Sequence, residues 1–376
     1  MPARPPLRFS TATLPCSEHT GEQLDAALDV HVIAGHVRRV ERAGFSALIV
    51  TDDVATSAEQ PDTPVLEPLT LLSALAMLTD KIGLVATVTT EANEPFHVAR
   101  RLASLDHVSD GRAGWNVDTR CSHREAGGFA RDVGGARGDR HERADEFLSV
   151  ARGLWDSYAD DALVADKRSG TYFRPARRRS LDHRGTYYDV AGPLNLSRSP
   201  QAYPVLFVTA DDEDSIAFAA RQADVVLTDA RSIDDVLILR TRLDHSHDAA
   251  ERTQEPVQIW PGVTPVVAPS QEEAVSRREE LQAALRGRSQ STSLREHPTG
   301  LIIAGTPRQV ADRITEWHEA GAADGFAVRF LQTPTDADLF LDGVLPILAQ
   351  RGVFVPPEGG TLREQLGLPR PNRSAA

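Results

Sequence analysis

The chain has 376 residues, of which 41% are hydrophobic and 25% charged, and its formal net charge at pH 7 is −13. This composition predicts one large or two smaller globular domains, and the negative charge argues against a nucleic-acid-binding protein. No apolar run approaches the roughly 20 residues of a membrane span, and the first residues lack the apolar core of a signal peptide. Only two cysteines occur, Cys16 and Cys121, so a disulfide framework is not expected and a cytoplasmic location is the simplest interpretation.

Apolar residues near the start of the chain recur at strand and helix spacing. Residues 7–13 and 45–50 are predicted as strands, with a helix over residues 23–43 between them and another over 67–78. Asp52 directly follows the second strand, where burial of a carboxylate is costly unless it binds a partner. Asp52 is therefore either a helix-capping residue or a site residue.

Residues 84–120 form the best-marked unit. Strand patterns at 84–90 and 112–117 flank a helix pattern at 95–109, which predicts one βαβ unit of a parallel sheet. Pro95 suits the first turn of a helix, and Asp110-Gly111 is a turn signal after its end. Polar residues gather where the two strands end: Thr87, Thr89, Thr90, Glu91 and Asn93 after the first, and Asn116 and Thr119 after the second. Because barrel enzymes build their sites at the carboxyl ends of parallel strands, we expect function there.

The same alternation continues to the end of the chain. Helices are expected over residues 141–158, 214–222, 233–245, 271–285, 308–320 and 336–350, and strands over 205–209, 224–228, 257–267 and 325–330. Insertions are expected at about 120–139, 160–200 and 285–300, with a hairpin over 186–197. The tail, 356–376, is expected to be irregular and to wrap a neighbouring subunit.

Strand–helix units recur without a composition break that would mark a domain boundary. We therefore predict an α/β protein with one domain over 1–376, a single (β/α)₈ TIM barrel with loop insertions. A doubly wound open sheet is the alternative, although no G-x-G-x-x-G follows the first strand.

The residue spacing alone does not name a reaction. No P-loop, HExxH, G-x-S-x-G or paired CxxC occurs. Cys16 and His19 have the spacing of a thiolate–imidazole pair. Arg120 and His141 border the insertion at 120–139 and are candidates for an anion site, while Trp115 is expected in the core.

Several long blocks resemble the luciferase-like flavin-dependent monooxygenases, in the branch of the nitrilotriacetate, dibenzothiophene-sulfone and long-chain alkane monooxygenases. The blocks are EPLTLLSALAML at 67–78, NEPFHVARRLASLDHVSDGRAGWNV at 93–117, ERADEFLSVARGLWDSYADDALVADKRSG at 142–170 and GTPRQVADRITEWHEAGAADGF at 305–326. They lie in the family's order and span nearly the whole chain.

The resemblance implies a two-component monooxygenase that uses O₂ and FMNH₂ on a small organic substrate. A separate NAD(P)H-dependent flavin reductase would supply the FMNH₂, and the chain would form a homo-oligomer or pair with a related chain, without nucleic acid or membrane. On the family's pattern, the cofactor-binding residues are Asp52, Thr87, Asn116, Thr119, Arg120, His141, Asp211 and Asp212. Cys16 and His19 match a Cys-x-x-His of the alkane-oxidising members and become the catalytic candidates, while no metal site is expected.

The chain also departs from the family at the expected FMN phosphate loop. A-G-S-S-E-x-G is replaced by residues 209–215, which place Asp211 and Asp212 where the family has serines. Two unit charges at 4 Å repel by about 4 kcal/mol in a protein-surface dielectric. Arg120 and His141 would offset part of that repulsion. The alternative function is therefore a barrel with lost or altered FMN binding, either a non-catalytic partner subunit or an enzyme with a different ligand.

Overall fold

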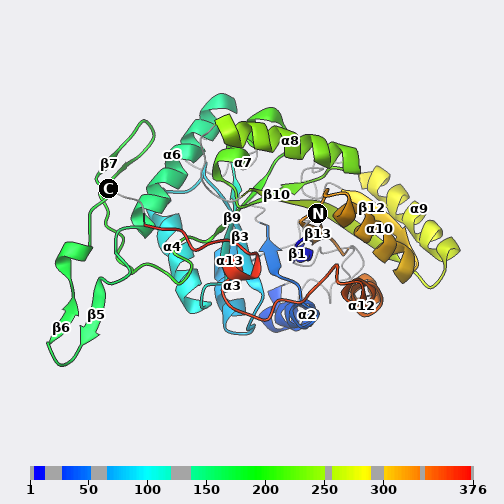
Figure 1. The fold of residues 1–376 in the computed structure, drawn as a ribbon, viewed down its shortest axis with the longest axis horizontal. Helices are drawn as coiled ribbons and strands as arrows, with labels where there is room; N and C mark the ends of the chain where they lie inside the picture. The colour runs from blue at the N-terminus through cyan, green and yellow to red at the C-terminus, as the bar shows by residue number, and fades with distance from the viewer. Residues whose placement is uncertain are drawn as a thin grey trace. The chain divides into compact units, whose positions relative to one another are not determined.

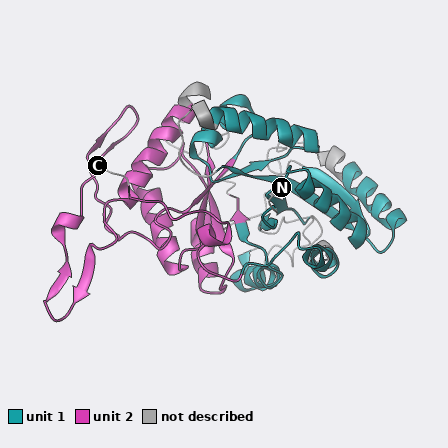
Figure 2. Ribbon diagram, viewed as in Figure 1, with its two compact units in different colours: residues 1–48, 209–357 teal, residues 49–208, 358–376 magenta. Residues whose placement is uncertain are grey.

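The computed structural model describes residues 4–12, 28–51, 66–119, 137–249, 256–288, 300–330 and 335–373. The chain forms two compact units: unit 1 contains residues 1–48 and 209–357, and unit 2 contains 49–208 and 358–376 (Figure 2). Parallel strands alternate with helices in both units (Figure 1). The hydrogen-bonded order of the strands is that of the predicted (β/α)₈ barrel. The single-domain organisation stays a prediction. In the described ranges, no helix has the length and apolar character needed to span a membrane.

The strands of unit 1 form a parallel sheet in the order β10–β11–β13–β1. They are β1 (Arg8–Ala12), β10 (Val225–Thr228), β11 (Gln258–Val267) and β13 (Gly325–Val328), close to the predicted ranges. The strand β12 (Leu301–Gly305), which pairs with the second half of β11, was not predicted.

The helices of unit 1 are α2 (Val30–Arg42), α7 (Glu213–Gln222), α8 (Ile233–Ala249), α9 (Gln271–Arg288) and α10 (Pro307–Glu319), followed by α11 (Thr335–Leu339), the π-helical segment η2 (Phe340–Val344) and α12 (Leu345–Gln350). The helix predicted over 336–350 is confirmed, and it contains one π-helical turn, η2. Pro346 has no backbone N–H, and its ring would clash with the carbonyl of Asp342 in a regular α-helix, so the preceding turn widens.

The core of unit 1 is aromatic. The Phe9 ring lies 5.3–6.3 Å, between ring centroids, from four other phenylalanine rings, which are Phe45, Phe326, Phe340 and Phe354. Phe9 projects from β1 and is fully buried. Aromatic pairs at these separations contribute packing beyond their buried area and hold the helices against the strands.

Unit 2 contains the predicted βαβ unit. The strands β3 (Gly83–Thr89), β4 (Ala113–Asp118) and β9 (Val205–Thr209) are parallel in that order, and β2 (Ala47–Val50) crosses the unit boundary. The helices are α3 (Pro68–Ala76), α4 (Pro95–Val108), α6 (Arg137–Trp155) and α13 (Leu362–Gln365), with α4 beside α6 in Figure 1. Asp110 and Gly111 both adopt left-handed backbone angles at the predicted turn. The β3–β4 register places Thr87 directly opposite Asn116.

The insertion at 160–200 folds as two small hairpins. They pair β5 (Leu163–Asp166) with β6 (Thr171–Phe173), and β7 (His183–Arg184) with β8 (Asp189–Val190), with a short 3₁₀ turn at Pro175–Arg177 between them. The hairpin predicted over 186–197 was therefore placed too late in the chain. Its tyrosines form the β7–β8 turn and not a strand, because Glu146 of α6 accepts hydrogen bonds from three backbone N–H groups of that turn.

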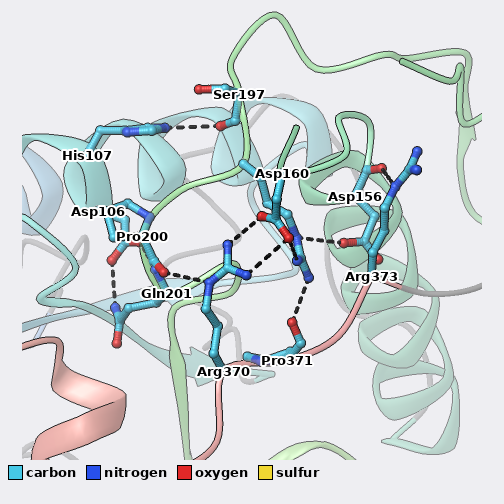
Figure 3. Close-up of polar contacts among 11 residues, drawn as sticks. Asp106, His107, Asp156, Asp160, Ser197, Pro200, Gln201, Arg370, Pro371 and Arg373 are labelled. Atoms are coloured by element: carbon cyan, nitrogen blue, oxygen red, sulfur yellow. Dashed lines mark hydrogen bonds and ion pairs between the residues drawn. The ribbon is translucent and has the colours of Figure 1, made fainter. Parts of the chain in front are cut away.

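The C-terminal tail packs on its own unit 2 over the described residues 358–373, and its contact with a neighbouring subunit stays a prediction. Arg370 donates to Asp160 at 2.6 Å and to the carbonyl of Pro200 at 2.8 Å (Figure 3). Arg198 donates to the carbonyl of Pro371 at 2.8 Å. These side-chain contacts hold the described part of the tail within unit 2.

Candidate functional site

A buried pair of side chains links the carboxyl ends of β3 and β4. Asn116 Nδ2 donates to Thr87 Oγ1 at 3.0 Å, and these residues are only 8% and 7% exposed. Asn116 Oδ1 is buried and has no hydrogen-bond partner among the described residues. A buried acceptor without a donor costs about 1–3 kcal/mol. Asn116 therefore presents an acceptor that suits a ligand N–H or O–H.

Thr119 and His141 form a second buried contact in unit 2. Thr119 Oγ1 lies 3.4 Å from His141 Nε2, which brings together two of the predicted cofactor-binding residues. Helix α6 was predicted to begin at His141 but begins at Arg137. His141 therefore lies in the second turn, where its side chain projects from a regular helix and not from a helix end.

A third cluster at the end of β3 was not assigned from the sequence. Glu91 is 5% exposed, and burial raises the pKa of its carboxyl although Arg143 and Arg140 of α6 act in the opposite direction. The Arg143 Cζ atom lies 5.2 Å from the ring centroid of Tyr188, and burial raises the pKa of Tyr188 to about 12. The sequence signal for this cluster was the spacing of Arg140 and Arg143, since residues i and i+3 share one helix face.

The turn between β9 and α7 carries Asp211 and Asp212. Asp212 is the N-cap of α7, and its Oδ1 accepts from the backbone N–H of Ser215 at 2.9 Å. Ser215 Oγ in turn accepts from the backbone N–H groups of Asp211 and Asp212, at 3.1 and 3.0 Å. These three N–H groups already have acceptors within the turn, so it does not offer them to a phosphate.

A cavity of 310 Å³ adjoins this turn within unit 1. Its lining includes Asp211, Asp229 and Asp235, and Asp229 accepts from Arg329 Nη2 at 2.9 Å. Carboxylates therefore outnumber cations around the cavity, which is unfavourable for a phosphate. The assignment of Asp211 and Asp212 to cofactor binding stays a prediction that this geometry does not favour.

Four predicted site residues lie outside the described residues: Cys16, His19, Asp52 and Arg120. Their roles in catalysis and cofactor binding stay predictions. Among the residues that the structure does describe, no group of three or more histidine, cysteine, aspartate or glutamate side chains is arranged to hold a metal ion.

The family model of the luciferase-like monooxygenases matches residues 8–324. The chain belongs to this family. It is 32% identical to N-acetyl-S-(2-succino)cysteine monooxygenase of Bacillus subtilis, over 95% of this chain and 94% of that protein. It is 34% identical to nitrilotriacetate monooxygenase component A of Aminobacter aminovorans, over 93% of this chain and 92% of that protein.

The fold comparison agrees with the sequence comparison. The crystal structure of riboflavin lyase with modified FMN and riboflavin is similar to this chain with a TM-score of 0.85 and 28% identity, over 97% of both chains. The predictions of the family, of its monooxygenase class and of the (β/α)₈ barrel are therefore confirmed.

Proposed function

We propose that the chain is the oxygenase component of a two-component monooxygenase that uses FMNH₂ and O₂ on a small organic substrate. The family and the named relatives support the reaction class. When bound, reduced flavin supplies the electrons that activate O₂. The tasks of the protein are to bind and orient the flavin and to exclude water from it.

The observation that carries this proposal is the unpartnered acceptor of Asn116. The flavin ring has N–H donors at its pyrimidine edge, and Asn116 Oδ1 is a buried acceptor that has no partner in the described ranges. Because Asn116 Nδ2 already donates to Thr87 Oγ1, the amide cannot rotate freely, and its oxygen is held in one position. The residues at the ends of β3 and β4 therefore fit the ring part of the cofactor.

The supply of reduced flavin calls for a second protein. One relative is named component A of nitrilotriacetate monooxygenase, a name that denotes one member of a multi-component system. We propose that an NAD(P)H-dependent flavin reductase serves this chain in the same way. A homo-oligomer, or a heterodimer with a related chain, and a cytoplasmic location also stay predictions.

Anaerobic titration of the full chain with FMNH₂, followed by calorimetry, tests the cofactor. We expect a Kd of about 10 μM or lower, which corresponds to roughly −7 kcal/mol. Asn116→Ala should weaken FMNH₂ binding by about tenfold, since it removes the buried acceptor and leaves Thr87 without its donor. Asn195→Ala, an exposed asparagine of the same unit, is the control and should change nothing. Absence of binding at about 100 μM would sink the proposal.

A second candidate function follows from the β9–α7 turn. Because Ser215 and Asp212 satisfy its N–H groups, the turn favours a ligand without a terminal phosphate. An enzyme that binds riboflavin or another phosphate-free ligand would fit this geometry. Equal affinity for reduced riboflavin and FMNH₂ would support it, whereas a strong preference for FMNH₂ would exclude it.

A further inference from the structure

Helix α6 brings two arginines to one face beside the end of β3. Arg140 and Arg143 are three residues apart, so their side chains are neighbours on the helix surface. Both side chains are half-buried, and both Nε atoms are buried without a hydrogen-bond partner in the described part of the chain. Buried donors of charged groups are seldom left unpaired, because each costs more than a neutral donor.

The β7–β8 hairpin places Tyr188 beside Arg143. Glu146 accepts from the backbone N–H groups of Thr186, Tyr187 and Tyr188 at 3.0, 3.0 and 2.8 Å, and its other partner is His183 Nε2 at 3.0 Å. The Tyr188 ring packs edge-to-face on Phe147 at 5.5 Å. Its hydroxyl is buried, and Arg143 both stacks on the ring and acts on the hydroxyl as a hydrogen-bonding neighbour. The contacts made by Glu146 therefore hold a phenol beside Arg143.

Glu91 is the acidic side chain on which both arginines act. Among the described residues, no ion pair joins Glu91 to either of them. Glu91 Oε1 is itself buried without a partner in these ranges. The other charged group that acts on Tyr188 is Glu94, at the start of α4. Burial thus disfavours the charged form of the carboxylate that interacts with both guanidinium groups.

We propose that Arg140, Arg143 and Tyr188 bind an oxyanion group of a ligand, either a carboxylate or a phosphate. Guanidinium N–H groups match the oxygens of both anions, and a phenol adds a neutral donor. We call this set of three residues the arginine site. It rests on the proposed function only where the anion is the flavin phosphate.

The two sources of such an anion can be separated. The phosphate of FMN is one, because the β9–α7 turn has its N–H groups already bonded. A carboxylate of the substrate is the other. If the phosphate occupies the arginine site, FMN will bind more tightly than riboflavin, and loss of an arginine will remove that preference. If a substrate carboxylate occupies the arginine site, succinate will bind there. The ratio of the affinities for FMN and riboflavin will then not depend on the arginines.

The test is calorimetric titration of the full chain at pH 7 with four probes: FMN, riboflavin, inorganic phosphate and succinate. Four variants are compared with the unchanged protein: Arg143→Gln, Arg140→Gln, Glu91→Gln and Arg152→Gln. The last removes another half-buried arginine of α6 and controls for general loss of helix charge. Thermal unfolding of each variant shows that it is folded at the titration temperature.

The arginine variants and the Glu91 variant should change the affinity for the anion in opposite directions. Arg143→Gln and Arg140→Gln should each lower the affinity for the anionic probe that occupies the site by about tenfold or more, since a charge-assisted hydrogen bond is lost. Glu91→Gln should raise the affinity for the same probe by about threefold or more, because it removes a negative charge that repels the anion. Arg152→Gln should stay within about twofold of the unchanged protein. A folding defect would not strengthen binding, so the Glu91 variant distinguishes the arginine site from a structural role.

Two results would overturn the arginine site. One is that neither phosphate nor succinate binds and FMN and riboflavin have equal affinity. The other is that an anion binds but its affinity is the same in Arg143→Gln, Arg140→Gln and Arg152→Gln. Failure of both flavins to bind, with succinate still sensitive to Arg143, would instead remove the proposed function and leave the arginine site standing.

Discussion

Asp212 and Ser215 bond to each other in both directions at the start of α7. The backbone N–H of Ser215 donates to Asp212 Oδ1 at 2.9 Å, and Ser215 Oγ accepts from the backbone N–H of Asp212 at 3.0 Å. The first turn also carries Glu213 and Asp214, and negative charge there stabilises a helix through its dipole. The turn is thus built to stabilise α7, at the position where relatives of this chain were expected to hold a phosphate.

Replacement of both aspartates of the turn by serine tests whether they repel a phosphate at this position. In the double variant Asp211→Ser with Asp212→Ser, serine can still cap α7, so the free energy of unfolding should change by less than about 0.5 kcal/mol. If a phosphate approaches the turn, the affinity for FMN should rise by about tenfold and that for riboflavin should not change. Calorimetry measures both, with Asp214→Ser as the single-charge control. An unchanged FMN affinity would place the phosphate elsewhere.

Glu91 should make the stability of the chain depend on pH. Burial raises the pKa of its carboxyl above the ordinary value of 4.5, so the folded state binds its proton more tightly than the unfolded state. Stability from this group is present below pH 4.5 and is lost as the pH rises through the raised pKa. Glu91→Gln should therefore match the unchanged protein at low pH and exceed it near pH 7 by on the order of 1 kcal/mol.

Urea unfolding at several pH values measures this difference. Glu142→Gln, an exposed acid of α6, is the control and should leave the pH profile unchanged. A Glu91 variant that loses stability at pH 7 would mean that the carboxylate is better paired than its surroundings indicate.

Two arginines beside the tail, Arg198 and Arg370, form ion pairs that should differ greatly in strength. Arg198 and Asp156 are almost fully buried and lie 3.2 Å apart, whereas Arg370 and Asp160 are about half exposed. Arg198→Ala should cost about 3–5 kcal/mol, because it leaves a buried carboxylate without its counter-charge. Arg370→Ala should cost less than about 1 kcal/mol. Urea unfolding compares the two, and equal losses would contradict the assignment of the buried pair as the stronger one.

Arg112 should resist replacement even by lysine. Its guanidinium donates to the carbonyls of Ala76, Thr79, Ile82 and Ser109 and to the Thr79 hydroxyl, at 2.8–3.0 Å. A lysine offers three donors from one atom and cannot reach all five acceptors. Arg112→Lys should lower the free energy of unfolding by about 1–3 kcal/mol. Arg100→Lys on the exposed face of α4 is the control, and an equal effect of both changes would contradict the argument.

Local signals predicted the βαβ unit well, and they placed Thr87 and Asn116 at the ends of its two strands. Pro95 begins α4, Asp110-Gly111 makes the turn, and the parallel register then fixes which strand-end residues lie opposite each other. The N-cap role of Asp212 was also within reach, because Asp-x-x-Ser at a helix start is a capping pattern.

The sequence shows the spacing of Arg140 and Arg143 but not the place of Tyr188 in the arginine site. Arg143 and Tyr188 are distant in the chain, and hydrogen bonds to Glu146 hold the β7–β8 turn on α6. Likewise, the π-helical turn in the last helix depends on how Pro346 meets the preceding turn, and not on periodicity. Both cases depend on contacts between segments whose arrangement follows from the whole fold.

The position of the tail has a consequence for how unit 2 is made during synthesis. The unit consists of residues 49–208 and 358–376, and the second segment supplies Arg363, which donates to the carbonyls of Tyr203 and Pro204. All of residues 209–357 emerge from the ribosome between the two segments. Domains generally fold as units while they are made. The carbonyls of Tyr203 and Pro204 must therefore remain solvated until the last part of the chain arrives, so unit 2 is completed after unit 1 has been synthesised.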